Sequence, residues 1–139
     1  MKKENEKKKE YLWRYREHVQ RINRIESELE EIRIMKIYPS MSIGDGMPHG
    51  TNNDDLSSYA AVLDKKEREL LKEKYLRVKE FIEISKCINN VTNQKESDVL
   101  FYRYIKGLDW WQVAEKMNYT ERWIHKLHGK ALEHIEVPN

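Results

Sequence analysis

Apolar residues recur at three- and four-residue steps along most of the chain, and the residues between them are mainly charged. Such spacing gathers the apolar side chains on one face of an α-helix. It predicts a long helix over residues 11–38, ended by Pro39, and a second, capped by Ser57 or Ser58, that ends near Ile88. The expected core positions are Leu12, Tyr15, Val19, Ile22, Ile25, Leu29 and Ile32 in the first helix, and Leu63, Leu70, Leu71, Tyr75, Val78, Phe81, Ile82 and Ile88 in the second.

Two stretches of the N-terminal part lack this pattern. Residues 1–10 are almost all Lys, Glu and Asn, a composition typical of a frayed helix end or a disordered tail. Residues 39–58 are rich in turn-forming residues and predict a loop, too long for a simple hairpin connection, that folds on a partner or over the helices. Residues 1–92 are therefore expected to form an antiparallel helical hairpin around this loop. Two helices bury little surface, and a homodimer through the N-terminal helices is one way to complete their core.

Three shorter helices are expected within residues 93–139, over residues 94–105, 110–117 and 121–134. Helix-capping residues mark their ends: Asn93 with Glu96, Asp109 with Gln112, and Gly107 after the first helix. Each helix is too short to be stable alone, so their apolar stripes must pack together into a helix-turn-helix domain. The expected core positions are Val99, Leu100, Tyr104, Val113, Ala114, Met117, Ile124, Leu127, His128, Ala131, Leu132 and Ile135. The fold class is thus all-α.

The polar face of the last helix carries candidate residues for reading DNA. In helix-turn-helix proteins the N-terminal end of the second helix of the motif enters the major groove. Arg122 is the best candidate for base recognition, because a guanidinium can bind guanine O6 and N7 together. Glu121 could accept a hydrogen bond from cytosine N4, and Lys106 and Trp110 are placed for the phosphate backbone. The expected DNA-binding residues are Lys106, Trp110, Thr120, Glu121, Arg122, His125, Lys126 and Lys130.

These residues belong to a longer pattern. The segments VLFYRYIKGLDWWQVAEKM (99–117) and YTERWIHKLHGKAL (119–132) resemble region 4 of primary-type bacterial sigma factors. With its charged N-terminal helices and the GMPHG segment (46–50), the whole chain is similar to sigma-like late-gene transcription regulators of phages of Gram-positive bacteria. The resemblance implies that Glu121, Arg122, His125 and Lys126 read a −35-like promoter element. Glu121 and His125 stand at positions that are usually basic, so a different target sequence is expected.

The resemblance also implies a partner. The chain has no room for the sigma region that melts the −10 element, so we expect an activator that works with the host's bacterial RNA polymerase on double-stranded DNA. The region 4 surface of sigma factors also meets the polymerase flap. The expected location is the cytoplasm of the bacterial host cell.

Charge leaves an alternative open. The net charge is +2; residues 1–24 carry nine Lys and Arg against four Glu, a difference of +5, whereas residues 95–139 carry seven Lys and Arg against seven Asp and Glu, a difference of zero. A neutral domain has weak non-specific affinity for DNA, because that affinity comes from phosphate neutralisation. The alternative is a helical protein-interaction module in which the trihelical bundle is structural and the hairpin binds the partner.

Other function classes find no support in the sequence. No nucleophile–base pair or Gly-rich phosphate loop is visible, so we expect no enzyme. His49 has no second ligand at metal-binding spacing, and His125 and His128 lack converging ligands, so neither a metal nor another cofactor is expected. The single Cys87 excludes an internal disulfide, and no apolar run approaches the roughly 18 residues of a membrane span.

Overall fold

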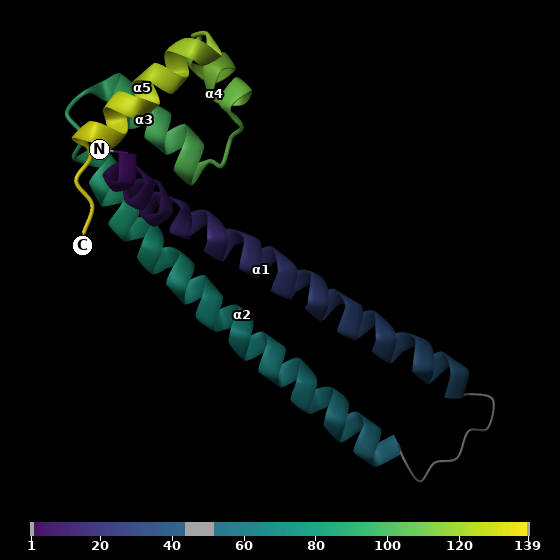
Figure 1. Ribbon diagram of the computed structural model, residues 1–139. Coiled ribbons are helices and arrows are strands. Elements are labelled where there is room, and N and C mark those ends of the chain that lie inside the picture. Colours follow the sequence, from purple (N-terminus) through teal and green to yellow (C-terminus); the bar gives the residue numbers. More distant parts are fainter. Residues whose placement is uncertain (1, 44–51, 139) are drawn as a thin grey trace. The chain divides into compact units, whose positions relative to one another are not determined.

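The structure, a computed structural model, describes residues 2–43 and 52–138 (Figure 1). Every regular element in these ranges is helical, which confirms the all-α prediction. None of the described helices combines the length and the apolar composition that a membrane crossing requires. The elements are α1 (Lys2–Ile43), α2 (Asn52–Asn89), α3 (Gln94–Leu100), the π-helical turn η1 (Phe101–Ile105), α4 (Trp110–Met117) and α5 (Glu121–His134).

Residues 20–75 form one compact unit, the hairpin unit, made of parts of α1 and α2. Ile22, Ile25 and Leu29 of α1 are buried in it, as the apolar pattern predicted. Ion pairs join the two helices at Arg21–Glu73, Glu26–Lys74, Glu28–Lys66 and Arg33–Glu67. Arg21 and Glu26 pair with residues 73 and 74, whereas Glu28 and Arg33, further along α1, pair with residues 66 and 67, so the helices run antiparallel and the predicted helical hairpin is confirmed.

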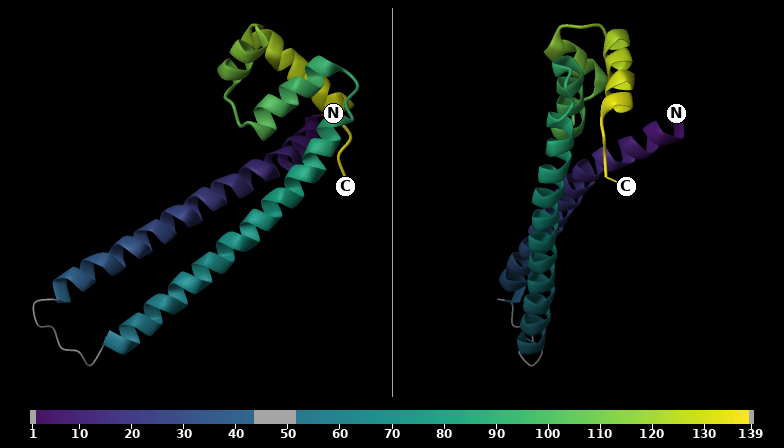
Figure 2. Two further views of the ribbon diagram at one scale, coloured as in Figure 1. Left: turned by 180° about the vertical axis from the view of Figure 1, so that it is seen from behind. Right: turned by 90° about the vertical axis from the view of Figure 1, so that its left-hand side faces the viewer.

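Residues 1–19 and 76–139 form the second compact unit, the C-terminal unit. Within it, α3, α4 and α5 pack together as a trihelical group, seen from two further sides in Figure 2. One core cluster joins Leu12 and Tyr15 of α1 and Ile84 and Ile88 of α2 to the trihelical group. The residues that the group contributes to this cluster are Leu100, Tyr104, Ile105, Ala131, Leu132 and Ile135.

The start of α1 differs from the expectation. Residues 2–10 are helical and continuous with the rest of α1, instead of forming a frayed end or a tail. Lys8 explains the difference: its side chain is buried, and its Nζ donates to the backbone oxygen of Leu132 at 2.7 Å. This contact joins residues 124 positions apart and orders the start of α1, although the composition of residues 2–10 does not indicate an ordered helix.

The loop boundaries also differ. α1 continues through Pro39 to Ile43, and α2 begins at Asn52, ahead of the expected caps Ser57 and Ser58. A proline removes one helical donor, but the helix can continue on both sides of it. The rest of the expected 39–58 loop, residues 44–51 with His49, lies outside the described residues.

The prediction of the buried face of α2 was wrong for its central part. Leu71, Tyr75, Val78 and Ile82 are exposed, whereas Ile84 and Ile88 are buried. α2 carries apolar residues on more than one face, and helical periodicity alone does not say which of them packs.

Candidate nucleic-acid interface

Local hydrogen bonds fix both helices of the helix-turn-helix where the sequence predicted them. The side chain of Gln112 accepts a hydrogen bond from the backbone N–H of Asp109 at 2.8 Å, which begins α4. The Thr120 hydroxyl accepts from the backbone N–H of Trp123 at 3.1 Å, which begins α5. Asn118, between the helices, adopts the left-handed conformation with φ of 58°. The bounds of α4 and α5 agree with the predicted helices.

At α3 the predicted cap is only partly confirmed. The Asn93 side chain accepts from the backbone N–H of Glu96 at 3.1 Å. The Glu96 carboxylate, however, is buried and lies 2.7 Å from Nδ1 of His134 on α5. The residue expected to complete a box at the start of α3 therefore ties α3 to the C-terminal end of α5.

A small apolar cluster holds the helix-turn-helix together. It consists of Val99 on α3, Val113 and Ala114 on α4, and Ile124 and Leu127 on α5. All five side chains are buried at the positions that the sequence predicted. The cluster fixes which side of α5 faces inward and leaves the opposite side to solvent.

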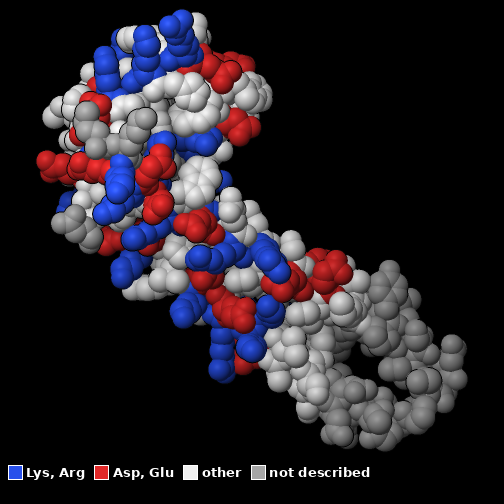
Figure 3. Space-filling model, in the orientation of Figure 1, with Lys and Arg blue, Asp and Glu red and all other residues white. Residues whose placement is uncertain are grey.

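The outward face of α5 carries most of the expected DNA-binding residues. Five of them are exposed, and Arg122, His125 and Lys126 fall on the side away from Ile124 and Leu127: Glu121, Arg122, His125, Lys126 and Lys130. Figure 3 shows Lys and Arg side chains gathered near the turn between α4 and α5. A domain that is neutral in sum thus presents cations at one end of its helix-turn-helix.

Trp123 lies beside these charged residues. Its side chain is 40% exposed, its ring centroid is 6.4 Å from that of Tyr119, and Nζ of Lys130 lies 5.8 Å from its centroid. The exposed face of α5 therefore combines cations with one large aromatic side chain.

The structure places the other three expected contacts differently. Trp110 is half-buried: its ring centroid is 4.4 Å from the guanidinium carbon of Arg103 and 4.8 Å from the ring centroid of His125. The Trp110 ring therefore packs against the His125 ring and helps to hold it in place. The Thr120 hydroxyl is used in the cap of α5. Lys106 is exposed, with its Nζ 5.9 Å from the Phe101 ring centroid, and no recorded contact of the described residues joins it to α5.

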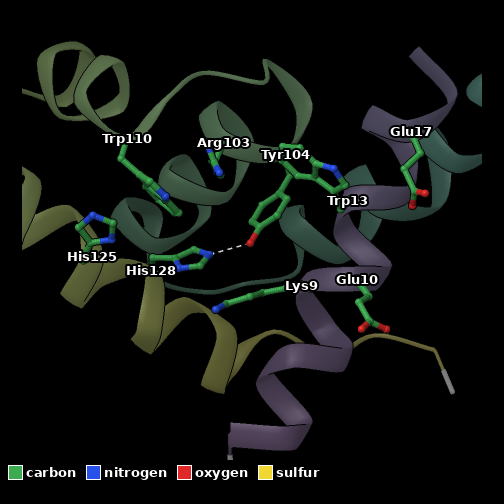
Figure 4. Close-up of a pocket in the computed structure, with 9 residues that line it drawn as sticks. All are labelled: Lys9, Glu10, Trp13, Glu17, Arg103, Tyr104, Trp110, His125 and His128. Carbon is green, nitrogen blue, oxygen red and sulfur yellow. Dashed lines mark hydrogen bonds between the residues drawn. The ribbon is translucent and has the colours of Figure 1, made fainter. Parts of the chain in front are cut away.

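A hollow of about 600 Å³ lies beside this face, within the C-terminal unit (Figure 4). Arg103 lies between two indole rings on its wall, 5.2 Å from the centroid of Trp13 and 4.4 Å from that of Trp110. Opposite it, the Tyr104 hydroxyl lies 2.8 Å from Nε2 of His128. The side chains around the hollow are Lys9, Glu10, Trp13, Glu17, Arg103, Tyr104, Trp110, His125 and His128.

Burial determines the protonation states of the hydrogen-bonded pair Tyr104 and His128. It lowers the pKa of His128 to about 3, with Lys9, Arg103 and His125 adding to the effect, and it raises the pKa of Tyr104 above its usual range. At neutral pH both groups are uncharged, so their hydrogen bond is a neutral one. Within residues 2–43 and 52–138, no group of three His, Cys, Asp or Glu side chains could hold a metal ion.

Sequence reasoning missed the residues that support α5. Trp13 and Arg103 are 90 positions apart, and Arg103 is presented by a π-helical turn that the helical pattern reads as ordinary α-helix. Such turns occur frequently at functional sites. Comparison of the chain with models of protein families, with curated proteins and with solved structures found no match.

Proposed function

We propose that the chain is a sequence-specific transcription regulator that binds double-stranded DNA, with α5 as the helix that reads the major groove. The observation that carries the proposal is the two-sidedness of α5. Ile124 and Leu127 are buried against α3 and α4, while Arg122, His125 and Lys126 are exposed at the N-terminal half of the same helix. This is the end that helix-turn-helix proteins insert into DNA.

The chemistry of the exposed face suits recognition of bases and phosphates. Arg122 can bind both acceptors of a guanine edge, and Glu121 can accept from cytosine N4. Lys126 and Lys130 follow at four-residue steps and supply cations for bases or phosphates. The positions matching Arg122 and Lys126 are also those that the resemblance to sigma region 4 assigns to the promoter.

The resemblance extends the proposal to a partner and a place. A regulator with this domain would act as an activator together with bacterial RNA polymerase, in the cytoplasm of the host cell. An overall neutral domain has weak non-specific affinity, so contact with polymerase would add to its hold on a promoter.

The test is selection of binding sites from random-sequence DNA with the full chain. The wild type is compared with an Arg122→Ala, Lys126→Ala variant and with a matched control, Arg68→Ala, Arg77→Ala, which removes the same charge from exposed positions of α2. We expect the wild type and the control to enrich the same site and the first variant to lose it. Loss of a two-pronged arginine contact costs about 1–3 kcal/mol, and affinity should fall as salt rises.

Equal selection by all three proteins would contradict the role of α5. Absence of any enriched site would favour the protein-interaction alternative, unless adding bacterial RNA polymerase restores a site that the Arg122, Lys126 variant cannot select.

A further inference from the structure

An exposed apolar stripe runs along one face of α2. Leu71, Tyr75, Val78 and Ile82 follow one another at steps of four, three and four residues, the spacing of the a and d positions of a coiled coil. Their side chains are 72%, 68%, 56% and 59% exposed. Single exposed apolar residues are ordinary, but four large ones on one helix face indicate a surface that binds something.

A row of lysines borders this stripe. Lys65, Lys72, Lys79 and Lys86 recur every seven residues and are all exposed. With Leu71 and Val78 at d positions, and Tyr75 and Ile82 at a positions, the four lysines occupy the e positions of the same heptads. Among the described residues, none of these four lysines forms an ion pair. The stripe and the row both belong to a single uninterrupted helix.

The lysine row argues against a second copy of this chain as the occupant. In an antiparallel coiled coil, e positions face e positions, so Lys72 would meet the second copy's Lys79, and Lys65 its Lys86. In a parallel pair, e positions face g positions, which are Glu67, Lys74 and Phe81 here. Glu67 would then attract the second copy's Lys72 and Lys74 would repel its Lys79, so the two effects cancel. Like charges placed opposite each other oppose association in the antiparallel pair, and the flanking charges give no net attraction in the parallel pair.

The other side of α2 argues against an anionic lipid surface. Helices that lie on such membranes carry Lys and Arg across their polar face. The polar side of α2 instead mixes cations with the carboxylates Glu69, Glu73, Glu80 and Glu83, and three of these cations, Lys66, Arg68 and Lys74, are paired with carboxylates. The four lysines that border the apolar stripe repeat every seven residues, a spacing that matches another helix.

We propose that this face of α2 binds an amphipathic helix of another protein, whose apolar heptad stripe covers Leu71, Tyr75, Val78 and Ile82 and whose Asp or Glu row pairs with the lysines. Burial of four large side chains supplies affinity, and the lysine row selects an acidic partner and its register. The proposal does not depend on DNA binding by α5.

The test uses two synthetic helical peptides with identical Leu and Ile heptads, one with Glu and one with Lys at the e and g positions. Each is titrated into the full chain and followed by fluorescence anisotropy. The wild type should bind the Glu peptide at least about tenfold more tightly than the Lys peptide. The Lys65→Glu, Lys72→Glu, Lys79→Glu, Lys86→Glu variant should reverse this preference. A control with the same charge change at the exposed residues Lys3, Lys7, Lys95 and Lys116 should keep it.

A Leu71→Ser, Val78→Ser variant should bind neither peptide. Both residues are exposed, so its circular dichroism should match that of the wild type. The proposal is overturned if both peptides bind equally, or if the wild type self-associates in ultracentrifugation and this variant does not. It is also overturned if the lysine variant loses binding to phosphatidylglycerol vesicles, or loses DNA binding that the Lys3, Lys7, Lys95, Lys116 control retains.

Discussion

Tyr104 and His128 share a buried hydrogen bond that ties the π-helical turn η1 to the middle of α5. The Tyr104 hydroxyl lies 2.8 Å from Nε2 of His128, and the two rings stack with centroids 5.7 Å apart. The Trp110 and His128 rings meet edge to face, with centroids 4.6 Å apart, so α4 contributes to the same arrangement. A proton added to His128 would place a charge in this buried contact, and the stability of the C-terminal unit should depend on it.

We therefore expect an acid-sensitive contribution from His128 to stability. Its pKa is about 3 in the folded chain against an ordinary value of 6.5, so the unfolded chain binds the proton more tightly. The stabilisation is fully present above pH 6.5 and is lost as the pH falls toward 3. At pH 5 the loss should be about 2 kcal/mol. Urea unfolding at pH 7 and pH 5 measures it.

The comparison variant is His128→Gln, which cannot take up a proton. It should be less stable than the wild type at pH 7 but should lose less stability between pH 7 and pH 5. His125→Gln, three residues earlier and exposed, should keep the wild-type pH dependence because His128 remains. An unchanged dependence in His128→Gln would show that another group controls acid stability.

A second prediction concerns the buried Lys8. Its Nζ donates to the backbone oxygen of Leu132 at 2.7 Å and lies 3.5 Å from that of Glu133, so it satisfies carbonyls in the last turn of α5. Lys8→Met keeps most of the apolar stem but removes the donor. The free energy of unfolding should fall by about 1–3 kcal/mol. The exposed neighbour supplies the control: Lys7→Met should stay within about 0.5 kcal/mol of the wild type. Equal effects in chemical denaturation would mean that the Lys8 bond contributes nothing.

How much of this structure the sequence predicts depends on the range of the interactions involved. The bounds of α4 and α5 follow from Asp109, Gln112 and Thr120, whose capping bonds span three residues. Their core positions follow from helical spacing, because each short helix has only one apolar face. The helix-turn-helix was therefore accessible from its own residues.

The features that the sequence could not give depend on distant partners. The residues around Lys8 in the sequence do not indicate that it contacts Leu132, so residues 2–10 were predicted to be a tail or a frayed helix end. On α2, Leu71 and Ile84 lie on different faces, and only the assembled core decides that Ile84 is buried. At the candidate interface, Arg122 and Lys126 were readable from the motif, whereas the support of His125 by Trp110 needed three dimensions.

A third prediction contrasts two glycines. Gly107 has φ of +71°, and a Cβ there would run into the guanidinium of Arg16, whose Nη1 donates to the backbone oxygen of Ile105 at 3.2 Å. Gly107→Ala should therefore cost about 1–2 kcal/mol, mainly from the left-handed backbone, while the flexible end of Arg16 moves aside.

The matched substitution is Gly129→Ala. Gly129 lies inside α5, and a Cβ at this position meets nothing within 4 Å. Alanine should stabilise the helix by about 0.5–1 kcal/mol. Thermal unfolding of the two variants should move in opposite directions relative to the wild type. A destabilised Gly129→Ala, or an unaffected Gly107→Ala, would contradict this account of the two positions.

The last prediction concerns the extent of the folding unit that holds the helix-turn-helix. Leu12 of α1 has no exposed surface and lies in the same core cluster as Leu100, Ala131 and Ile135. Leu12→Ala should lower the free energy of unfolding by about 2–5 kcal/mol, because it leaves a cavity in that shared core. Leu71→Ala removes the same atoms from a side chain that is 72% exposed and should change stability by about 0.5 kcal/mol or less. Circular dichroism and urea unfolding of the two variants measure this.

The same core implies that a fragment of residues 93–139 alone should lack cooperative unfolding. Leu100, Tyr104 and Ile135 would lose the partners that α1 and α2 provide. Urea unfolding of the fragment, followed by circular dichroism, measures its cooperativity. A fragment that unfolds as cooperatively as the full chain would show that the trihelical group folds without α1.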